Sequence, residues 1–356
     1  MDRETIMLGS IFNIQGCRTM ENMGNQMDDV PTNGFQQDVD QVLLLLEENP
    51  EWEERYARYA KEIHAHLADN LSVRKGFREW SPLKVYLNVS GAKSDRASVR
   101  FELRYLGQTV ALLKGSPDRL LVTKAFDVLN ERDFDCPIRL DGAPWEGHDA
   151  ARFRHFFKDR APARNTTNRK GNQEHRLESL LLSEFEKTTG KKLPHIQPVK
   201  IANCRFPMPT PLSASHHDRI KYSGVYGGGI DILARTGSGG SRTRLCVIEL
   251  KDENTRREPP EDAMKQAVAY ATFLRTLLRS SAGKDWWGLL GFGGSVPKSL
   301  VLQAACAMPS NDNNQYFHSE RLSLGDDAIE LHSIYFNECG NSIVSIVSSL
   351  IPQQSS

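Results

Sequence analysis

Paired cysteines are missing from this sequence. Its six cysteines are Cys17, Cys136, Cys204, Cys246, Cys306 and Cys339. They lie far apart, and no two of them form a Cys-x-x-Cys motif. This spacing excludes a disulfide framework and the zinc sites that are built from cysteine pairs, and it indicates free thiols in a reducing compartment.

Long apolar runs and an excess of charge of one sign are also absent. No stretch approaches the roughly 18 consecutive apolar residues of a membrane helix, and residues 1–4 do not begin a secretory signal pattern. Lys and Arg together number 45, as do Asp and Glu, so no global basic field attracts nucleic acid. We therefore expect a cytoplasmic protein with no membrane partner, in which any nucleic-acid binding comes from local patches.

Motifs that bind nucleotides or read a DNA groove are missing as well. Residues 286–295 are rich in glycine, but no Lys-Ser or Lys-Thr follows in the place that a phosphate loop requires. The sequence also carries no helicase or helix-turn-helix signal. Any targeting must then come from the first part of the chain or from a partner protein.

The length of 356 residues suggests two domains. Residues 1–40 show no sustained periodicity and are expected to be irregular or partly disordered. A helical pattern begins near Gln41, and apolar residues alternate with polar ones between residues 84 and 124, which predicts an antiparallel meander. Residues 41–159 are therefore expected to form a small α+β domain that serves targeting or binds a partner.

Residues 160–171 combine Pro and Gly with polar and basic residues, as an interdomain linker does. They lie within residues 151–176, the most basic stretch of the chain. Arg164, Arg169 and Lys170 could neutralise the phosphates of a nucleic acid without reading its sequence. The alternative is a solvated flexible joint with no binding role.

The second part of the chain is organised around one expected hairpin. Two strand-like runs, residues 229–235 and 245–251, flank a stretch rich in Gly and Ser. A turn centred near Gly240 places Asp231 opposite Glu249, with Cβ atoms roughly 4.5–5.5 Å apart. Two carboxylates this close need a cation between them, and a hard divalent ion is the natural candidate.

Lys251 lies two residues after Glu249 and therefore projects from the same face of the strand. Its ammonium would lie beside the metal ion. The backbone carbonyl of Leu250, at the exposed end of the strand, is a further candidate ligand. The expected metal ligands are thus Asp231, Glu249 and Leu250.

An acid on one strand and acid-x-Lys on the next resembles the PD-(D/E)xK nuclease superfamily, over about residues 172–335 of an expected nuclease domain of residues 172–356. The resemblance implies an α/β fold with a restriction-endonuclease-like core, in which a mixed central sheet is flanked by helices. Here the smaller α+β domain precedes that core. The resemblance also implies Mg²⁺-dependent hydrolysis of phosphodiester bonds, with Mn²⁺ as an alternative ion and with DNA more common than RNA as the substrate.

Two helices carry the other site residues that the resemblance implies. Glu178, on a helix before the hairpin, would bind or orient the metal, and Glu184 on the same helix is the alternative. On a helix after the hairpin, Gln266 would join the catalytic residues and Tyr270 would contact the substrate, because residues four apart share a helix face. Lys251 would orient the attacking water or offset the charge that grows on the phosphate.

Further strand-like runs lie before and after the hairpin in the sequence. Residues 199–206 are expected to form the first core strand, and residues 301–308 and 329–336 supply later ones. The resulting order of helix, strands, helix and strands is that of the superfamily core.

Two other classes of protein remain open. In one, the nuclease fold is catalytically silent and binds DNA or a partner protein. In the other, the protein is an enzyme of an unrelated type whose carboxylates coincide by chance. The complete set of two acids and a lysine favours the nuclease, because a binding protein has no need to bury such a cluster. We expect an effector of a defence or repair system, guided by a partner subunit, and it could form a homo-oligomer.

Overall fold

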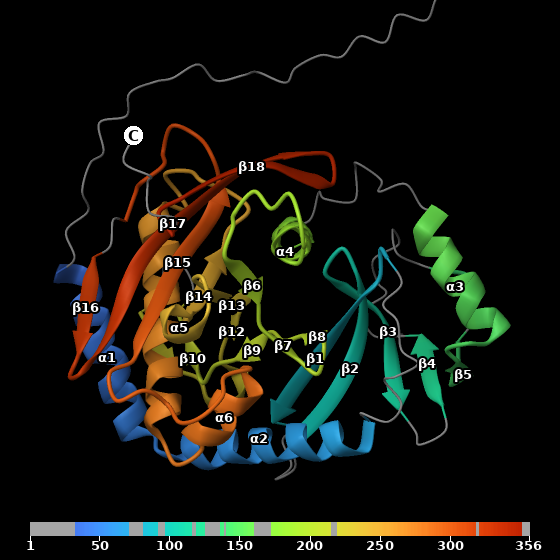
Figure 1. Ribbon diagram of the computed structural model, residues 1–356, viewed down its shortest axis with the longest axis horizontal. Helices are drawn as coiled ribbons and strands as arrows, with labels where there is room; N and C mark the ends of the chain where they lie inside the picture. The colour runs from blue at the N-terminus through green and yellow to red at the C-terminus, as the bar shows by residue number, and fades with distance from the viewer. Residues whose placement is uncertain are drawn as a thin grey trace, which may run out of the picture.

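Two seven-stranded β-sheets lie side by side in the computed structural model of the protein, with helices around them (Figure 1). Within the part of the chain that the structure describes, no helix combines the length and the apolar character that a membrane crossing needs. The structure describes residues 33–70, 81–91, 97–115, 119–124, 136–138, 140–159, 172–214, 219–317 and 320–350.

The first sheet has seven strands in the order β5-β4-β3-β2-β1-β8-β7. Strands β1 to β4 pair with one another in antiparallel fashion, which confirms the expected meander. The strands are β1 (Lys84–Gly91), β2 (Ala97–Tyr105), β3 (Gln108–Gly115), β4 (Leu120–Lys124), β5 (Ala143–Pro144), β7 (Lys200–Ile201) and β8 (Cys204–Arg205).

The second sheet, called the core sheet below, is mixed and runs in the order β16-β17-β15-β14-β13-β6, with β18 paired to β17. Strands β14, β15 and β17 are parallel, and β6, β13 and β14 are antiparallel. Parallel strands occur where both faces of a sheet are covered, and β15 is accordingly buried along nearly its whole length. The strands are β6 (Ile196–Pro198), β13 (Ile232–Thr236), β14 (Arg244–Leu250), β15 (Val301–Pro309), β16 (Arg321–Leu324), β17 (Asp327–Cys339) and β18 (Ser342–Ser348).

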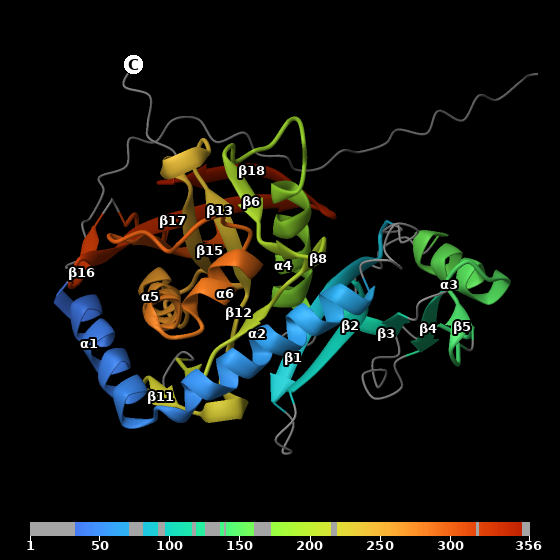
Figure 2. The same ribbon diagram turned by 60° about the horizontal axis from the view of Figure 1, so that its bottom comes forward.

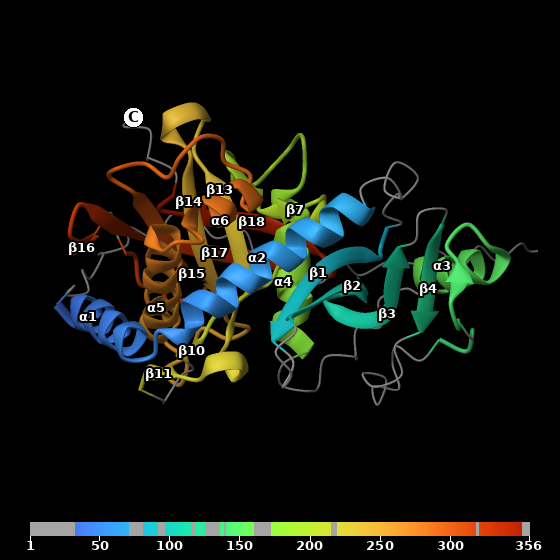
Figure 3. The ribbon, with the colours of Figure 1, turned by 90° about the horizontal axis from the view of Figure 1, so that it is seen from below.

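Helices cover both faces of the core sheet. Because successive side chains of a strand point to opposite faces, β13 directs Leu233 into the layer of α5 and Ile232 into the layer of α4. Figure 2 shows α4 between the core strands and the first sheet, and Figure 3 shows α2 running across both sheets. The helices are α1 (Asn33–Glu48), α2 (Glu51–Asn70), α3 (His148–Asp159), α4 (Asn172–Phe185), α5 (Pro260–Arg279) and α6 (Gly283–Leu289).

The expected hairpin forms as β13 and β14. Leu233 pairs with Val247, as a turn centred near Gly240 predicts. Gly237, at the start of the turn, has φ 95°, and a Cβ atom there would lie 2.3 Å from the carbonyl oxygen of Arg242. Only glycine fits this position, so it helps to fix the register of the whole hairpin.

Helix α1 begins at Asn33 rather than near Gln41. Phe35, Val39 and Val42 are buried at helical spacing, and the helix packs on α5. Phe35 and Val39 are the only apolar residues between positions 33 and 41, which is too few to reveal a period. The N-terminal helix therefore packs against α5 and the edge strand β16 of the core sheet.

Residues 199–206 do not form the first core strand. Strand β6 takes that place beside β13, and Ala202 and Asn203 then adopt positive φ values of 52° and 63°, which turns the chain between β7 and β8. Strand β8 pairs in parallel with β1, where Arg205 lies opposite Tyr86. The run thus joins the first sheet and ties the two halves of the chain together.

One buried arginine holds this junction between the sheets. The guanidinium of Arg205, 1% exposed, donates to both carboxylate oxygens of Glu186 at 2.9 and 3.0 Å, to the Tyr86 hydroxyl at 3.1 Å and to Ser183 Oγ at 3.2 Å. Burial alone would raise the pKa of Glu186, but the hydrogen bonds and charge of Arg205, aided by Lys84 and Lys200, hold that pKa at about 2. The junction is therefore a satisfied buried ion pair.

Replacing Arg205 should destabilise the fold strongly. In Arg205→Ala, the buried carboxylate of Glu186 loses its main partner, which should lower the free energy of unfolding by about 3–5 kcal/mol. Lys84→Ala removes a more exposed partner of the same carboxylate and should cost about 1 kcal/mol or less. Urea titration of both variants checks this, and equal costs would mean that Arg205 does not hold the junction.

Candidate active site

The structure places Asp231 and Glu249 opposite each other at one end of the core sheet. Asp231 lies between β12 (Gly229–Ile230) and β13, and Glu249 is the penultimate residue of β14. Ile232 pairs with Ile248, so the next position along the ladder sets Asp231 against Glu249 on the same face of the sheet. The backbone N–H of Leu250 donates to Asp231 Oδ2 at 2.9 Å, which fixes the Asp231 side chain beside β14.

This acid pair, Asp231 and Glu249, is short of positive charge. Glu249 is fully buried, and neither of its carboxylate oxygens has a hydrogen-bond donor among the described residues. Burial raises its pKa well above the usual value, and the charge of Asp231 raises it further. Burial and the charge of Glu174 likewise raise the pKa of Asp231, to about 7. Both carboxylates therefore favour either a proton or a metal ion as a partner.

Lys251 supplies the nearest cation. Its Nζ lies 3.4 Å from Glu174 Oε1, and its pKa is raised, because the charges of Glu174, Glu249 and Asp231 outweigh the effect of burial. The ammonium is thus held charged beside the acid pair. We did not expect Glu174 from the sequence, although it is an acid in the first turn of α4, one turn before Glu178.

The structure distinguishes the two helix acids that the sequence left open. Glu178 is buried, its charge helps to raise the pKa of Asp231, and its Oε1 has no hydrogen-bond partner among the described residues. Its Oε2 lies 3.5 Å from His175 Nδ1. Glu184 faces elsewhere, because it pairs with Lys187 and accepts a bond from the backbone N–H of Lys192. Glu178 is therefore the one that belongs to the site.

Helix α5 brings Tyr270 against the acid pair, because Asp231 and Glu249 lie on the face of the sheet that α5 covers. Burial and the charge of Glu249 raise the pKa of its hydroxyl, which lies 3.4 Å from Gln266 Nε2. A Cβ atom on Gly228 would lie 2.1 Å from that hydroxyl, so the glycine makes room for it. Tyr270 is only 1% exposed, so its ring is covered by protein atoms and does not offer a face on which a substrate could stack.

The basic residues expected to bind phosphate, Arg164, Arg169 and Lys170, lie outside the described residues. Among the residues described, no three His, Cys, Asp or Glu side chains converge as a ready metal site. The ligand set that the geometry offers is therefore the two carboxylates of the acid pair, with the Leu250 backbone beside them.

Comparisons with protein-family models, with curated proteins and with solved structures give no match to this chain. Function is therefore inferred from the geometry of the site and from the motif.

Without metal, the acid pair should lower the stability of the fold as the pH rises. The pKa of Glu249 is higher in the folded chain than its ordinary value of 4.5, so folding takes up a proton, and stability falls above about pH 4.5 by up to about 1.4 kcal/mol per pH unit for each such group. Glu249→Gln should remove this loss. In EDTA the variant should melt above wild type at pH 7, with the difference shrinking towards pH 4.

The exposed Glu253 provides a matched control, since Glu253→Gln should leave the difference in melting temperature flat across the same range. Added Mg²⁺ should stabilise wild type more than Glu249→Gln, because the metal replaces the missing cation. A Glu249→Gln protein that melts below wild type at every pH would contradict the claim that the acid pair destabilises the fold in the absence of metal.

Proposed function

We propose that the protein is a Mg²⁺-dependent nuclease that hydrolyses phosphodiester bonds of DNA. The observation that carries the proposal is the acid pair at the end of the β13–β14 hairpin, in which Glu249 is fully buried, with the charged Lys251 beside it. DNA is proposed because it is the commonest substrate of the superfamily that the motif resembles.

The donors of the site suit a hard divalent cation. Both oxygens of Glu249 are without a hydrogen-bond donor in the described part of the chain, and oxygen ligands are those that Mg²⁺ prefers. The N–H and C=O of a strand residue point towards the same neighbouring strand, and the N–H of Leu250 is directed at Asp231, so its carbonyl fits as a third ligand. Mg²⁺ is usually held by one or two carboxylates and keeps several waters.

When bound, Mg²⁺ would polarise the phosphate and activate a water molecule for attack. The chain itself contributes the position of a positive charge. Glu174 holds the Lys251 ammonium beside the acid pair, where it would stabilise the negative charge that grows on the phosphate oxygens. Because the charge is already in place before the reaction, no reorganisation is needed when the substrate arrives.

The remaining residues would orient the acid pair. Glu178 would bind or orient the metal from α4, with its free Oε1 as the acceptor atom. Gln266 and Tyr270 would support Glu249 from α5. These roles predict that Tyr270→Phe reduces activity less than any change to the acid pair.

Two substitutions distinguish an active nuclease from a catalytically silent binding module. Asp231→Ala removes a metal ligand, so Mg²⁺ affinity and cleavage should both fall. Lys251→Ala removes only the ammonium, so the metal should still bind while cleavage falls by about 10²–10³. Calorimetry with Mg²⁺ and digestion of plasmid DNA measure the two effects, and Lys61→Ala, an exposed change on α2, is the matched control.

One outcome would reject the nuclease. This is a wild-type protein that cleaves neither DNA nor RNA with Mg²⁺ or Mn²⁺, alone and with its natural partners, and it would favour the silent module. Full activity of Lys251→Ala would instead keep the nuclease and exclude Lys251 from its mechanism. Cleavage of RNA but not of DNA would support the nuclease activity and identify RNA as the substrate.

A further inference from the structure

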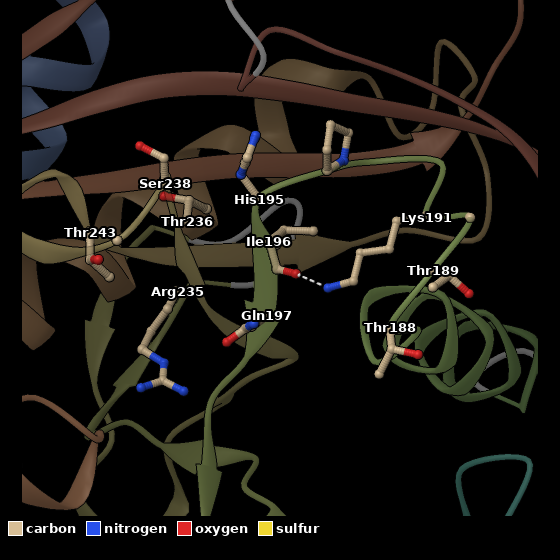
Figure 4. A pocket seen from close by; sticks show the side chains of 14 residues that line it. Thr188, Thr189, Lys191, His195, Ile196, Gln197, Arg235, Thr236, Ser238 and Thr243 are labelled. Atoms are coloured by element: carbon tan, nitrogen blue, oxygen red, sulfur yellow. Dashed lines mark hydrogen bonds between the residues drawn. The ribbon is translucent and has the colours of Figure 1, made fainter.

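A groove lies at the far end of the β13–β14 hairpin from the acid pair. It has a volume of about 620 Å³ and is lined by residues 188–191 and 194–197, which follow α4 and reach into β6, and by residues 235–239 and Thr243 of the hairpin. Figure 4 shows Lys191 reaching towards β6 from one side and Arg235 lying on the other. The groove therefore extends around the edge strand of the core sheet.

The two segments that form the groove carry positive charge without acids. Residues 187–197 and 235–244 contain no Asp or Glu, although acids and bases balance over the whole chain. The local excess of positive charge raises the concentration of anions at this surface. Lys191 and Arg235 line the groove, and Lys187 pairs with Glu184 outside the lining. The other cations of the two segments are Lys192, Arg242 and Arg244.

Both lining cations donate hydrogen bonds to backbone carbonyls, although the charge of the buried Glu184, which pairs with Lys187, also acts on Lys191. Lys191 Nζ donates to the carbonyl of Ile196 at 2.7 Å, and Arg235 Nη1 donates to the carbonyl of Gly291 at 3.1 Å. The Nε of Arg235 is buried and has no acceptor within the described ranges. Carbonyls satisfy hydrogen bonds but carry no full charge, so both side chains keep donors and charge for an anion.

The groove is also preformed. The N–H of Gly237 donates to the carbonyl of His195 at 2.9 Å, and Arg235 pairs with Gln197 in the ladder of β13 and β6. His195 itself has φ 57°, a left-handed backbone held by these contacts. Hydroxyl groups of Thr188, Thr189, Ser238 and Thr243 add neutral hydrogen-bond donors around the cations (Figure 4).

We propose that this groove binds a ligand that carries several phosphate groups. A volume of about 620 Å³ is that of a small-molecule site, and cations on both sides of β6 suit more than one phosphate. The acid pair lies about 17 Å away, because Asp231 and Thr236 are separated by the length of β13 at roughly 3.3 Å per residue. The groove is therefore a separate site, which does not depend on the metal or on catalysis.

Two sources offer the same phosphate chemistry: a free nucleotide or polyphosphate, and the backbone of a single-stranded nucleic acid. The test measures binding of ATP, inorganic tripolyphosphate and a short labelled single-stranded DNA to the full chain in EDTA, where metal-dependent cleavage does not enter. Lys191→Gln and Arg235→Gln are compared with Lys61→Gln, which removes an exposed cation on α2 away from the groove. Circular dichroism checks that each variant is folded.

Each groove variant should bind about tenfold more weakly than wild type, the loss expected for one charged hydrogen bond, and Lys61→Gln should bind as wild type does. For the DNA, the slope of log affinity against log salt should flatten by about 0.7 for each cation removed. Loss of ATP and tripolyphosphate binding would identify a free phosphorylated ligand, and loss of DNA binding alone would identify a nucleic-acid backbone.

The proposal is overturned if wild type binds none of the three probes, or if Lys191→Gln and Arg235→Gln bind them as tightly as Lys61→Gln does. If Arg235→Gln fails to fold, Lys191→Gln decides the matter, since Lys191 lies in a surface loop. Because the binding assay contains no metal, a negative result would not contradict the proposed nuclease activity. Equally, a protein without nuclease activity would not contradict phosphate binding in the groove.

Discussion

The burial of Glu249 at the end of a packed hairpin is the constraint on which the rest of the site depends. A carboxylate with no hydrogen-bond donor, facing a second carboxylate, costs free energy in a dry interior. The packing of two hydrophobic layers, one formed with α5 and one with α4, offsets this free-energy cost. Those layers fix the backbone so firmly that the two acids cannot move apart. The strain is then relieved only by a proton or by a cation that binds from outside.

Much of the site was predictable because its geometry is local. A glycine-rich turn sets the register of a hairpin within a few residues, and the positions of Asp231, Glu249 and Lys251 follow from alternation along its two strands. The meander of the first sheet was predictable for the same reason, since short connections join neighbours in sequence. The start of α1 was missed because only Phe35 and Val39 mark its first turns.

The features that the sequence did not reveal arise from contacts between distant segments. Glu174 meets Lys251 only because α4 lies across the end of β14. Helix α4 is buried on nearly all sides, so its apolar pattern does not distinguish Glu178 from Glu184. The placement of β7 and β8 in the first sheet depends on pairing with β1, and the cationic groove depends on two loops that meet at β6. No periodicity among neighbouring residues predicts any of these long-range contacts.

The pairing of β1 with β8 has a consequence for how the chain reaches its fold. Strand β1 ends at residue 91, whereas its parallel neighbour begins at residue 204, and loops of that length close slowly. During synthesis the N-terminal sheet therefore emerges with one edge unpaired until the segment around Arg205 has left the ribosome. Until β8 pairs with it, the β1 edge of that sheet has unpaired backbone groups, and such an edge can pair with another chain.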